Sequence, residues 1–183
     1  MSNVIFGFVA ASGSGKTTMV EAAVRELAGK LQIIRSATSR ASRGSGDVPH
    51  YEFFSRAAFE QLIRDDELVY HVEYAGNYYG ILKREIARVL DSSDGILALV
   101  EQSVRLLRTA GYTVHVVKVT TRGKPEFPDA TRRKADAERA KDPLVPDVVI
   151  VNDFTAPDGL QRATSQLVEF VRATQLEKQP VAA

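Results

Sequence analysis

Residues 10–17 read Ala-Ala-Ser-Gly-Ser-Gly-Lys-Thr, and this stretch decides the fold. It matches the Walker A pattern, with alanine where the first glycine usually stands. Gly13 and Gly15 permit turns that bulkier residues avoid, so successive backbone N–H groups can point into one concavity. A buried-strand pattern at 4–10 precedes the loop, and apolar residues at helical spacing follow it at 17–27. This order predicts a phosphate-binding loop between a strand and a helix.

The polar residues of this loop suit nucleotide chemistry. Lys16 is predicted to contact the β- and γ-phosphates of a nucleoside triphosphate, and the positive end of the helix dipole adds to its charge. The Thr17 hydroxyl is placed to ligate Mg²⁺. ATP and Mg²⁺ are therefore the expected cofactors. The candidate cofactor-binding residues of the loop are Ser12, Gly13, Ser14, Gly15, Lys16, Thr17 and Thr18.

Length and composition exclude several other classes of protein. The 183 residues are 44% apolar and 26% charged, which predicts one folded domain and not a disordered chain. Lys and Arg number 24 against 23 Asp and Glu, so a net charge of +1 gives no electrostatic reason to expect a nucleic-acid or membrane partner. The absence of cysteine excludes a disulfide framework and a thiolate zinc site.

The N-terminal apolar run is too short for a membrane anchor. It also lacks a basic region in front of it, so we do not interpret it as a signal peptide. No stretch approaches the roughly 18 apolar residues that span a bilayer. These features favour a soluble, cytoplasmic protein, and we expect a monomer or a homodimer.

The rest of the chain alternates between strand and helix patterns. Residues 36–49 are dense in Ser, Gly and Arg and are expected to form a polar loop. Short, antiparallel-looking strands at 50–80 indicate a small inserted lobe, so the order predicts a three-layer α/β fold on a parallel central sheet. Further strands are expected at 31–34, 51–54, 67–74, 95–100, 112–119 and 148–151, and helices at 55–64 (with Ser55 as N-cap), 82–90, 102–110, 130–141 and 157–175.

Two arginines in the polar loop indicate a second phosphate site. Residues 36–43 read Ser-Ala-Thr-Ser-Arg-Ala-Ser-Arg, which places Arg40 and Arg43 three residues apart after a strand. Guanidinium groups bind phosphate oxygens through two parallel hydrogen bonds, so this pair could hold an acceptor phosphate that faces the Walker A loop. A solvated basic loop would show the same pattern, and the segment alone leaves both readings open.

Taken together, these motifs resemble the guanylate kinase family of nucleoside monophosphate kinases. The resemblance is spread over residues 4–153 and implies a P-loop kinase fold with an inserted acceptor-binding lobe and a shortened lid. Besides the two motifs above, it rests on YEFFSRAAFEQLI from Tyr51, EYAGNYYG from Glu73 and VVIVND from Val148. The implied organisation is one domain at 1–176, with the lobe at about 36–82 and the lid at about 120–134, followed by a flexible tail at 177–183.

The family resemblance also implies roles for individual residues. The implied reaction is ATP-dependent transfer of the γ-phosphoryl group to the phosphate of a nucleoside monophosphate, GMP or dGMP-like. Lys16 would be catalytic together with the lid arginines Arg122 and Arg133, and Asn152 would lie near the donor adenine. The acceptor phosphate would be held by Ser36, Arg40, Arg43, Tyr51 and Tyr79.

The sequence departs from the family at the positions that contact the guanine base. Tyr70 stands where the family has a glutamate, and Ala98 and Val100 stand where it has two aspartates. Glu101 offers a carboxylate one residue away from the second of these positions. Tyr70 and Glu101 are therefore candidate substrate-binding residues, and the preferred base is left open.

Two other functions stay open on the sequence. The first is a ribose 1,5-bisphosphate phosphokinase, which has a similar fold and needs no base-binding site; Asp47, His50 and the missing carboxylates favour it. The second is a non-enzymatic module that binds phosphorylated peptides, as the guanylate-kinase-like domains of membrane scaffolds do. The intact phosphate-binding loop argues against this module, because such domains lose their ATP site.

Overall fold

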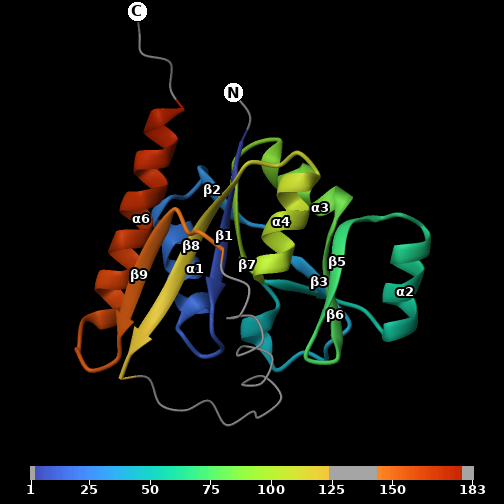
Figure 1. Ribbon diagram of the computed structural model, residues 1–183, viewed down its shortest axis with the longest axis horizontal. Coiled ribbons are helices and arrows are strands. Elements are labelled where there is room, and N and C mark those ends of the chain that lie inside the picture. Colours follow the sequence, from blue (N-terminus) through green and yellow to red (C-terminus); the bar gives the residue numbers. More distant parts are fainter. Residues whose placement is uncertain (1–2, 124–143, 179–183) are drawn as a thin grey trace, which may run out of the picture.

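A computed structural model of the chain describes residues 3–123 and 144–178. At its centre lies a five-stranded sheet of order β2-β7-β1-β8-β9, in which every pairing is parallel (Figure 1). The predicted parallel central sheet is thus confirmed. Its strands are β1 (Ile5–Ala10), β2 (Leu31–Ile33), β7 (Asp94–Leu99), β8 (Val114–Arg122) and β9 (Val148–Asp153).

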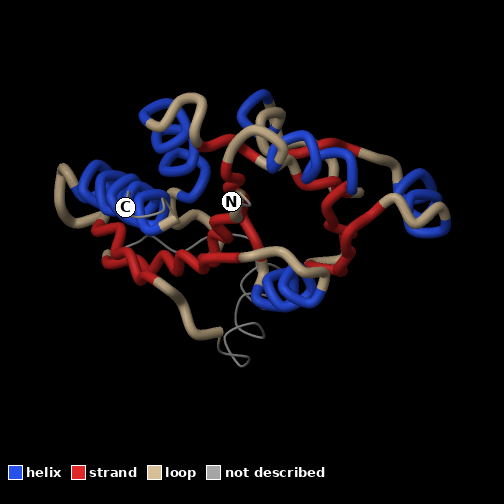
Figure 2. The backbone as a smooth tube through the Cα atoms, turned by 90° about the horizontal axis from the view of Figure 1, so that it is seen from above, coloured by secondary structure: helices blue, strands red, loops and turns tan. Residues whose placement is uncertain are grey.

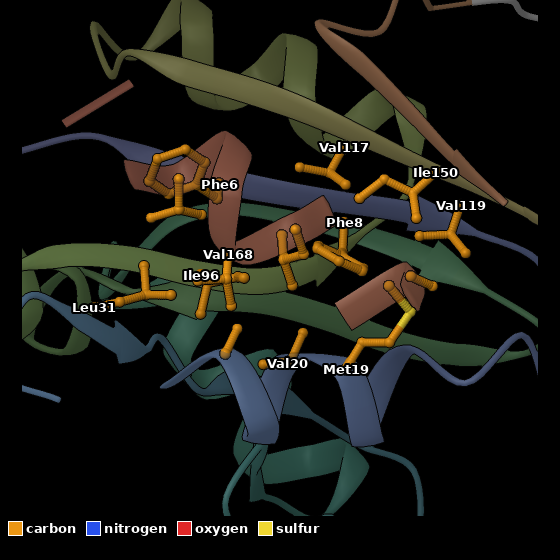
Figure 3. Close-up of a cluster of buried hydrophobic side chains, with 14 of the residues drawn as sticks. Phe6, Phe8, Met19, Val20, Leu31, Ile96, Val117, Val119, Ile150 and Val168 are labelled. Atoms are coloured by element: carbon orange, nitrogen blue, oxygen red, sulfur yellow. The ribbon is translucent and has the colours of Figure 1, made fainter. Parts of the chain in front are cut away.

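Helices cover both faces of this sheet (Figure 2). Phe6 and Phe8 of β1 pack with residues of α1 (Lys16–Glu26) and α6 (Gly159–Glu177), as Figure 3 shows. Ile5 and Val9 alternate with them and pack with residues of α3 (Lys83–Leu90) and α4 (Glu101–Thr109) on the other face. The three layers follow from this alternation. In the part of the chain that the structure describes, no helix is both long and apolar enough to cross a bilayer.

A second sheet lies at the end of the molecule opposite α6 (Figure 1). It falls between β2 and α3 in the sequence, where an inserted lobe is predicted. The strand order is β4-β3-β6-β5; β3 and β4 pair in parallel, and the other two pairings are antiparallel. Its elements are β3 (Ser36–Thr38), β4 (Tyr51–Phe53), α2 (Arg56–Arg64), β5 (Leu68–Tyr74) and β6 (Asn77–Leu82).

Several predicted boundaries are wrong, and two of them show why. The stretch expected to be a polar loop begins with strand β3, whose three residues are buried between β4 and β6 and are too few to show a period in the sequence. Strand β8 continues past Val119 to Arg122, because its last polar residues still pair with β9. The predicted N-cap is confirmed, since the Ser55 hydroxyl accepts from the Ala58 N–H at 3.1 Å. The helix predicted at 130–141 lies outside the described residues.

Candidate active site

The P-loop, residues 10–17, connects β1 to α1 at the carboxyl edge of the central sheet, where parallel α/β sheets bind ligands. Gly13 and Gly15 adopt φ angles of 72° and 87°, in the left-handed region that favours glycine. A Cβ atom on Gly15 would come within 2.7 Å of Asn152 Nδ2, so a side chain has no room there. Lys16 Nζ donates to two loop carbonyl oxygens, at 3.0 and 2.8 Å. Its ammonium group therefore already lies beside the loop.

Asn152 supports the P-loop from strand β9. Its side chain is buried, and Nδ2 donates to the Ser14 carbonyl oxygen at 3.0 Å. This bond joins the loop after β1 to a strand that lies two positions away in the sheet. The resemblance places Asn152 near the donor adenine, whereas its contact here is with the backbone that would cradle the phosphates.

Arg40 is held in the loop after β3 and is only 8% exposed. Its Nη1 donates to Asp47 Oδ2 at 2.9 Å and to the Ala41 carbonyl oxygen at 2.7 Å. Its Cζ lies 5.0 Å from the ring centroid of Tyr51, within cation–π range. Asp47 also accepts from the backbone N–H of Arg43 at 2.8 Å. One carboxylate thus holds the guanidinium group of Arg40 and the backbone of Arg43.

Charge pairing secures the ionisation of this cluster. Burial acts to lower the pKa of Arg40, but the hydrogen bond and charge of Asp47 raise it above its ordinary value. Burial likewise acts to raise the pKa of Asp47, but Arg40 and the Arg43 N–H hold it below its ordinary value. Burial raises the pKa of the Tyr51 hydroxyl. At neutral pH the site therefore presents a guanidinium and a neutral phenol beside a paired carboxylate.

Two buried side-chain atoms make no hydrogen bond among the described residues. They are Ser14 Oγ in the P-loop and Arg40 Nε after β3. An unpaired buried polar group costs about 1–3 kcal/mol, and folded proteins contain few of them. Both residues line one cavity. Both atoms are covered from solvent, so they lie beneath the wall of this cavity.

This cavity has a volume of about 430 Å³ and lies between the P-loop and the second sheet. It brings together most of the predicted site residues, from segments far apart in the sequence. The predicted residues that line it are Ser12, Gly13, Ser14, Gly15, Lys16, Thr17, Thr18, Ser36, Arg40, Arg43, Tyr51, Tyr70 and Tyr79.

The remaining predicted residues are not gathered at the cavity. Arg122 ends β8 with an exposed side chain, and its Nη1 lies 3.6 Å from Asp153 Oδ2. Glu101 is the first residue of α4 and does not line the cavity. Arg133 lies outside the described residues. Asn152, described above, does not line the cavity either. The roles assigned from the sequence, to these residues and to those at the cavity, stay predictions.

The cavity also includes residues that the sequence did not single out as binding residues. Asp47 has a sequence signal, since a carboxylate four residues after Arg43 is a natural partner for an arginine pair. Ser103 has none, because its place depends on the packing of α4 against β5. The further lining residues are Ala10, Asp47, Val72, Tyr74, Ala98, Leu99, Val100 and Ser103.

The described residues contain no group of three or more His, Asp or Glu side chains that could hold a metal ion. Mg²⁺ at a phosphate site needs no such group, because phosphate and water oxygens supply most of its ligands. Thr17 lies in the first turn of α1 and lines the cavity. Its hydroxyl is placed to be the single protein ligand of a phosphate-bound Mg²⁺.

Comparison with known proteins accords with this geometry. The family model described as guanylate kinase matches residues 3–156. The chain belongs to the guanylate kinase family. The curated guanylate kinase of Thiobacillus denitrificans is 29% identical to it, over 96% of this chain and 88% of the relative. That of Neisseria meningitidis serogroup A is 30% identical, over 95% and 89%.

A solved structure is also similar to this guanylate kinase family member. The crystal structure of guanylate kinase from Anaplasma phagocytophilum matches it with a TM-score of 0.72 at 21% identity, over 97% of this chain and 88% of the other. The predicted P-loop kinase fold is therefore confirmed. As a member of the guanylate kinase family, the chain is a nucleoside monophosphate kinase.

Proposed function

We propose that this protein transfers the γ-phosphoryl group of ATP to the phosphate of a nucleoside monophosphate, with GMP or dGMP as the first candidates. One observation carries the proposal: the P-loop and the Arg40 cluster line the same cavity. The P-loop side of the wall suits a donor phosphate chain, and Arg40 with Arg43 on the other side suits an acceptor phosphate. The names of the relatives support a guanylate acceptor.

The residues on the cavity wall suit phosphoryl transfer, which depends mostly on positioning and charge neutralisation. Lys16 would neutralise the donor phosphates, while Arg40 and Arg43 would hold the acceptor phosphate. An acceptor phosphate oxygen then forms a bond to the γ-phosphorus as the bond to the bridging oxygen of the leaving ADP breaks. The products are ADP and a nucleoside diphosphate, and no general base is required because the acceptor phosphate is already anionic.

Further groups complete the proposed machinery. The Thr17 hydroxyl would hold Mg²⁺, which supplies charge neutralisation on the donor phosphates when bound. Tyr51 and Tyr79 can each donate a hydroxyl hydrogen bond to the acceptor phosphate. Arg122 and Arg133 are proposed, on the family resemblance, to approach the transferring group from the lid.

The test is transfer of label from γ-³²P-ATP to a panel of acceptors, separated by chromatography. The panel holds AMP, GMP, CMP, UMP, their deoxy forms and ribose 1,5-bisphosphate. We expect labelled nucleoside diphosphate from the wild-type protein. Lys16→Ala should lower kcat by roughly 100-fold or more, the size of one lost transition-state contact. Lys30→Ala, at an exposed lysine after α1, is the matched control and should behave as wild type.

Three results would contradict the proposal. Label that appears only on ribose 1,5-bisphosphate would identify a sugar-phosphate kinase. ATP binding without transfer to any member of the panel would favour a binding module. Near-normal turnover by a folded Lys16→Ala protein would show that the P-loop lysine takes no part in phosphoryl transfer.

A further inference from the structure

One part of the cavity wall is formed where β5 and β7 meet the start of α4. Tyr70 and Val72 come from β5, Val100 follows β7, and Ser103 lies in the first turn of α4. The Ser103 side chain lies close enough to the Tyr70 hydroxyl to act on it: burial raises the pKa of this phenol, and Ser103 opposes that rise. Both residues are almost fully buried from solvent, yet both line the cavity. A buried pair of neutral hydroxyls is therefore exposed to whatever occupies the cavity.

The described wall of the cavity has no free carboxylate. Its one carboxylate is Asp47, and this group already accepts from Arg40 Nη1 at 2.9 Å and from the Arg43 N–H at 2.8 Å. A guanine edge carries an N–H and an amino group, both donors, beside one carbonyl acceptor. Charge-assisted bonds to such donors are about twice as strong as neutral ones. The described wall thus offers the N–H and amino donors of guanine no free carboxylate, the partner that would favour guanine strongly over other bases.

Resting on the kinase function proposed above, we propose that the Tyr70–Ser103 hydroxyl pair contacts the acceptor base and makes the acceptor site tolerant of several purine bases. Each hydroxyl both donates and accepts. Together the two hydroxyls offer protons to donate and lone pairs that can accept. It can therefore match the edges of guanine, hypoxanthine and adenine by neutral hydrogen bonds. Burial supports this role, since it raises the pKa of Tyr70 and keeps the phenol protonated.

The apolar neighbours favour a planar base in this part of the cavity. Val72, Leu99 and Val100 line the cavity together with the pair, and no lysine or arginine lines it on β5, β7 or α4. A second phosphate group would find no counter-charge on these elements. A neutral ring is stabilised by burial against the apolar side chains. Its polar edge loses little free energy on leaving water, because the two hydroxyls replace the hydrogen bonds to water.

The experiment compares kcat/KM for GMP, IMP and AMP with ATP as donor, for the wild type and for Tyr70→Phe. IMP differs from GMP only by lacking the 2-amino group. We expect the three wild-type values to fall within roughly tenfold of one another, as neutral hydrogen bonds allow. Tyr70→Phe should change the GMP-to-AMP ratio by roughly 3- to 10-fold, since one hydroxyl partner is lost, and should leave the KM for ATP unchanged.

Two further variants separate base contact from structural support. Ser103→Ala removes the partner hydroxyl with little change in volume, and should alter the same ratio if Tyr70→Phe folds poorly. Tyr112→Phe is the matched control, because Tyr112 packs against the same core cluster but does not line the cavity. If Tyr70 and Ser103 only supported the structure, each substitution would change kcat/KM for GMP, IMP and AMP by the same factor. A changed GMP-to-AMP ratio therefore indicates contact with the base.

Several results would overturn the inference. A wild-type preference for GMP over both IMP and AMP of more than roughly 1,000-fold would require charge-assisted contacts from elsewhere. A GMP-to-AMP ratio of kcat/KM that is unchanged in both Tyr70→Phe and Ser103→Ala would show that the pair does not contact the base. Failure to phosphorylate any nucleotide is a different result: it would refute the proposed kinase function itself.

Discussion

At the scale of single residues, Arg40 is oriented by the protein before an acceptor binds. Its Nη1 donates to Asp47 and to the Ala41 carbonyl oxygen, and its Cζ lies 5.0 Å from the centroid of the Tyr51 ring. Nε is left without a protein partner. Because an oriented side chain loses little entropy on binding, this arrangement favours affinity for the acceptor phosphate.

Arg40→Ala should raise the KM for the acceptor roughly tenfold or more, because an interaction made in both the ground and transition states is lost. The KM for ATP should change little, since Arg40 lies in the acceptor lobe. Steady-state kinetics with each substrate varied in turn measures both. Arg56→Ala is the control, because Arg56 stacks on Tyr78 and does not line the cavity. A rise in the ATP KM alone would reverse our assignment of the two phosphate sites.

Asn152→Ala should produce the opposite pattern. Removing its bond to the Ser14 carbonyl oxygen loosens the P-loop, so the KM for ATP should rise roughly 3- to 10-fold while the acceptor KM stays near wild type. Asn77→Ala is a matched control, since Asn77 Nδ2 makes a bond of the same length, 3.0 Å, to the Ala75 carbonyl oxygen in a hairpin turn. If Asn77→Ala raised the ATP KM equally, the effect would not come from the P-loop.

At the scale of elements, an ion cluster joins the two places where the chain passes between the sheets. Arg35 lies between β2 and β3, and Glu85 lies in the first turn of α3, directly after β6. Glu85 is 3% exposed and accepts from the Arg35 N–H at 3.1 Å, from Arg35 Nε at 3.2 Å and from Arg88 Nη2 at 2.9 Å. The entry and exit of the second sheet are thus fixed to one another.

This cluster predicts a pH dependence of stability. Burial acts to raise the pKa of Glu85, but hydrogen bonds from Arg88 and Arg35 bring it from its ordinary value of 4.5 to about 2. A lowered pKa stabilises the fold above the unfolded value, and this stabilisation is lost as the pH falls toward 2. We expect Glu85→Gln to lower the free energy of unfolding by about 3 kcal/mol at pH 7, and the difference from wild type to shrink below pH 4.5.

Urea denaturation at pH 7, 5, 4 and 3 measures this difference. Glu60→Gln is the control, because Glu60 forms only an exposed pair with Arg56 and should change stability by less than about 1 kcal/mol. A destabilisation by Glu85→Gln that is constant across this range would show that packing, and not charge, accounts for it.

The elements differ in how far the sequence predicts them. β1 and α1 follow from buried β-branched residues, glycines that need positive φ, and a helical spacing of apolar residues, all of which are local signals. β3 could not be predicted, because three residues show no period and their strand conformation depends on β4 and β6 on either side. The last residues of β8 look like a loop because they are polar, but their backbone groups pair with β9.

At the scale of the whole molecule, the two sheets contribute different parts of one cavity. The position of the P-loop, Arg40 and Arg43 at this cavity could be predicted, because short sequence motifs mark all three. Ser103 and the bracing contact of Asn152 could not, because each depends on which element packs beside it. The sequence therefore predicts which charged groups line the cavity better than it predicts which residues surround them.

The central claim is that one cavity holds donor and acceptor together. Titration calorimetry with a bisubstrate compound, adenosine and guanosine joined through five phosphates, tests it most directly. We predict one molecule bound per chain, more tightly than ATP or GMP, with affinity lowered roughly tenfold or more by Lys16→Ala and likewise by Arg40→Ala. Two molecules bound per chain, or an affinity equal to that of ATP and unaffected by Arg40→Ala, would contradict the claim.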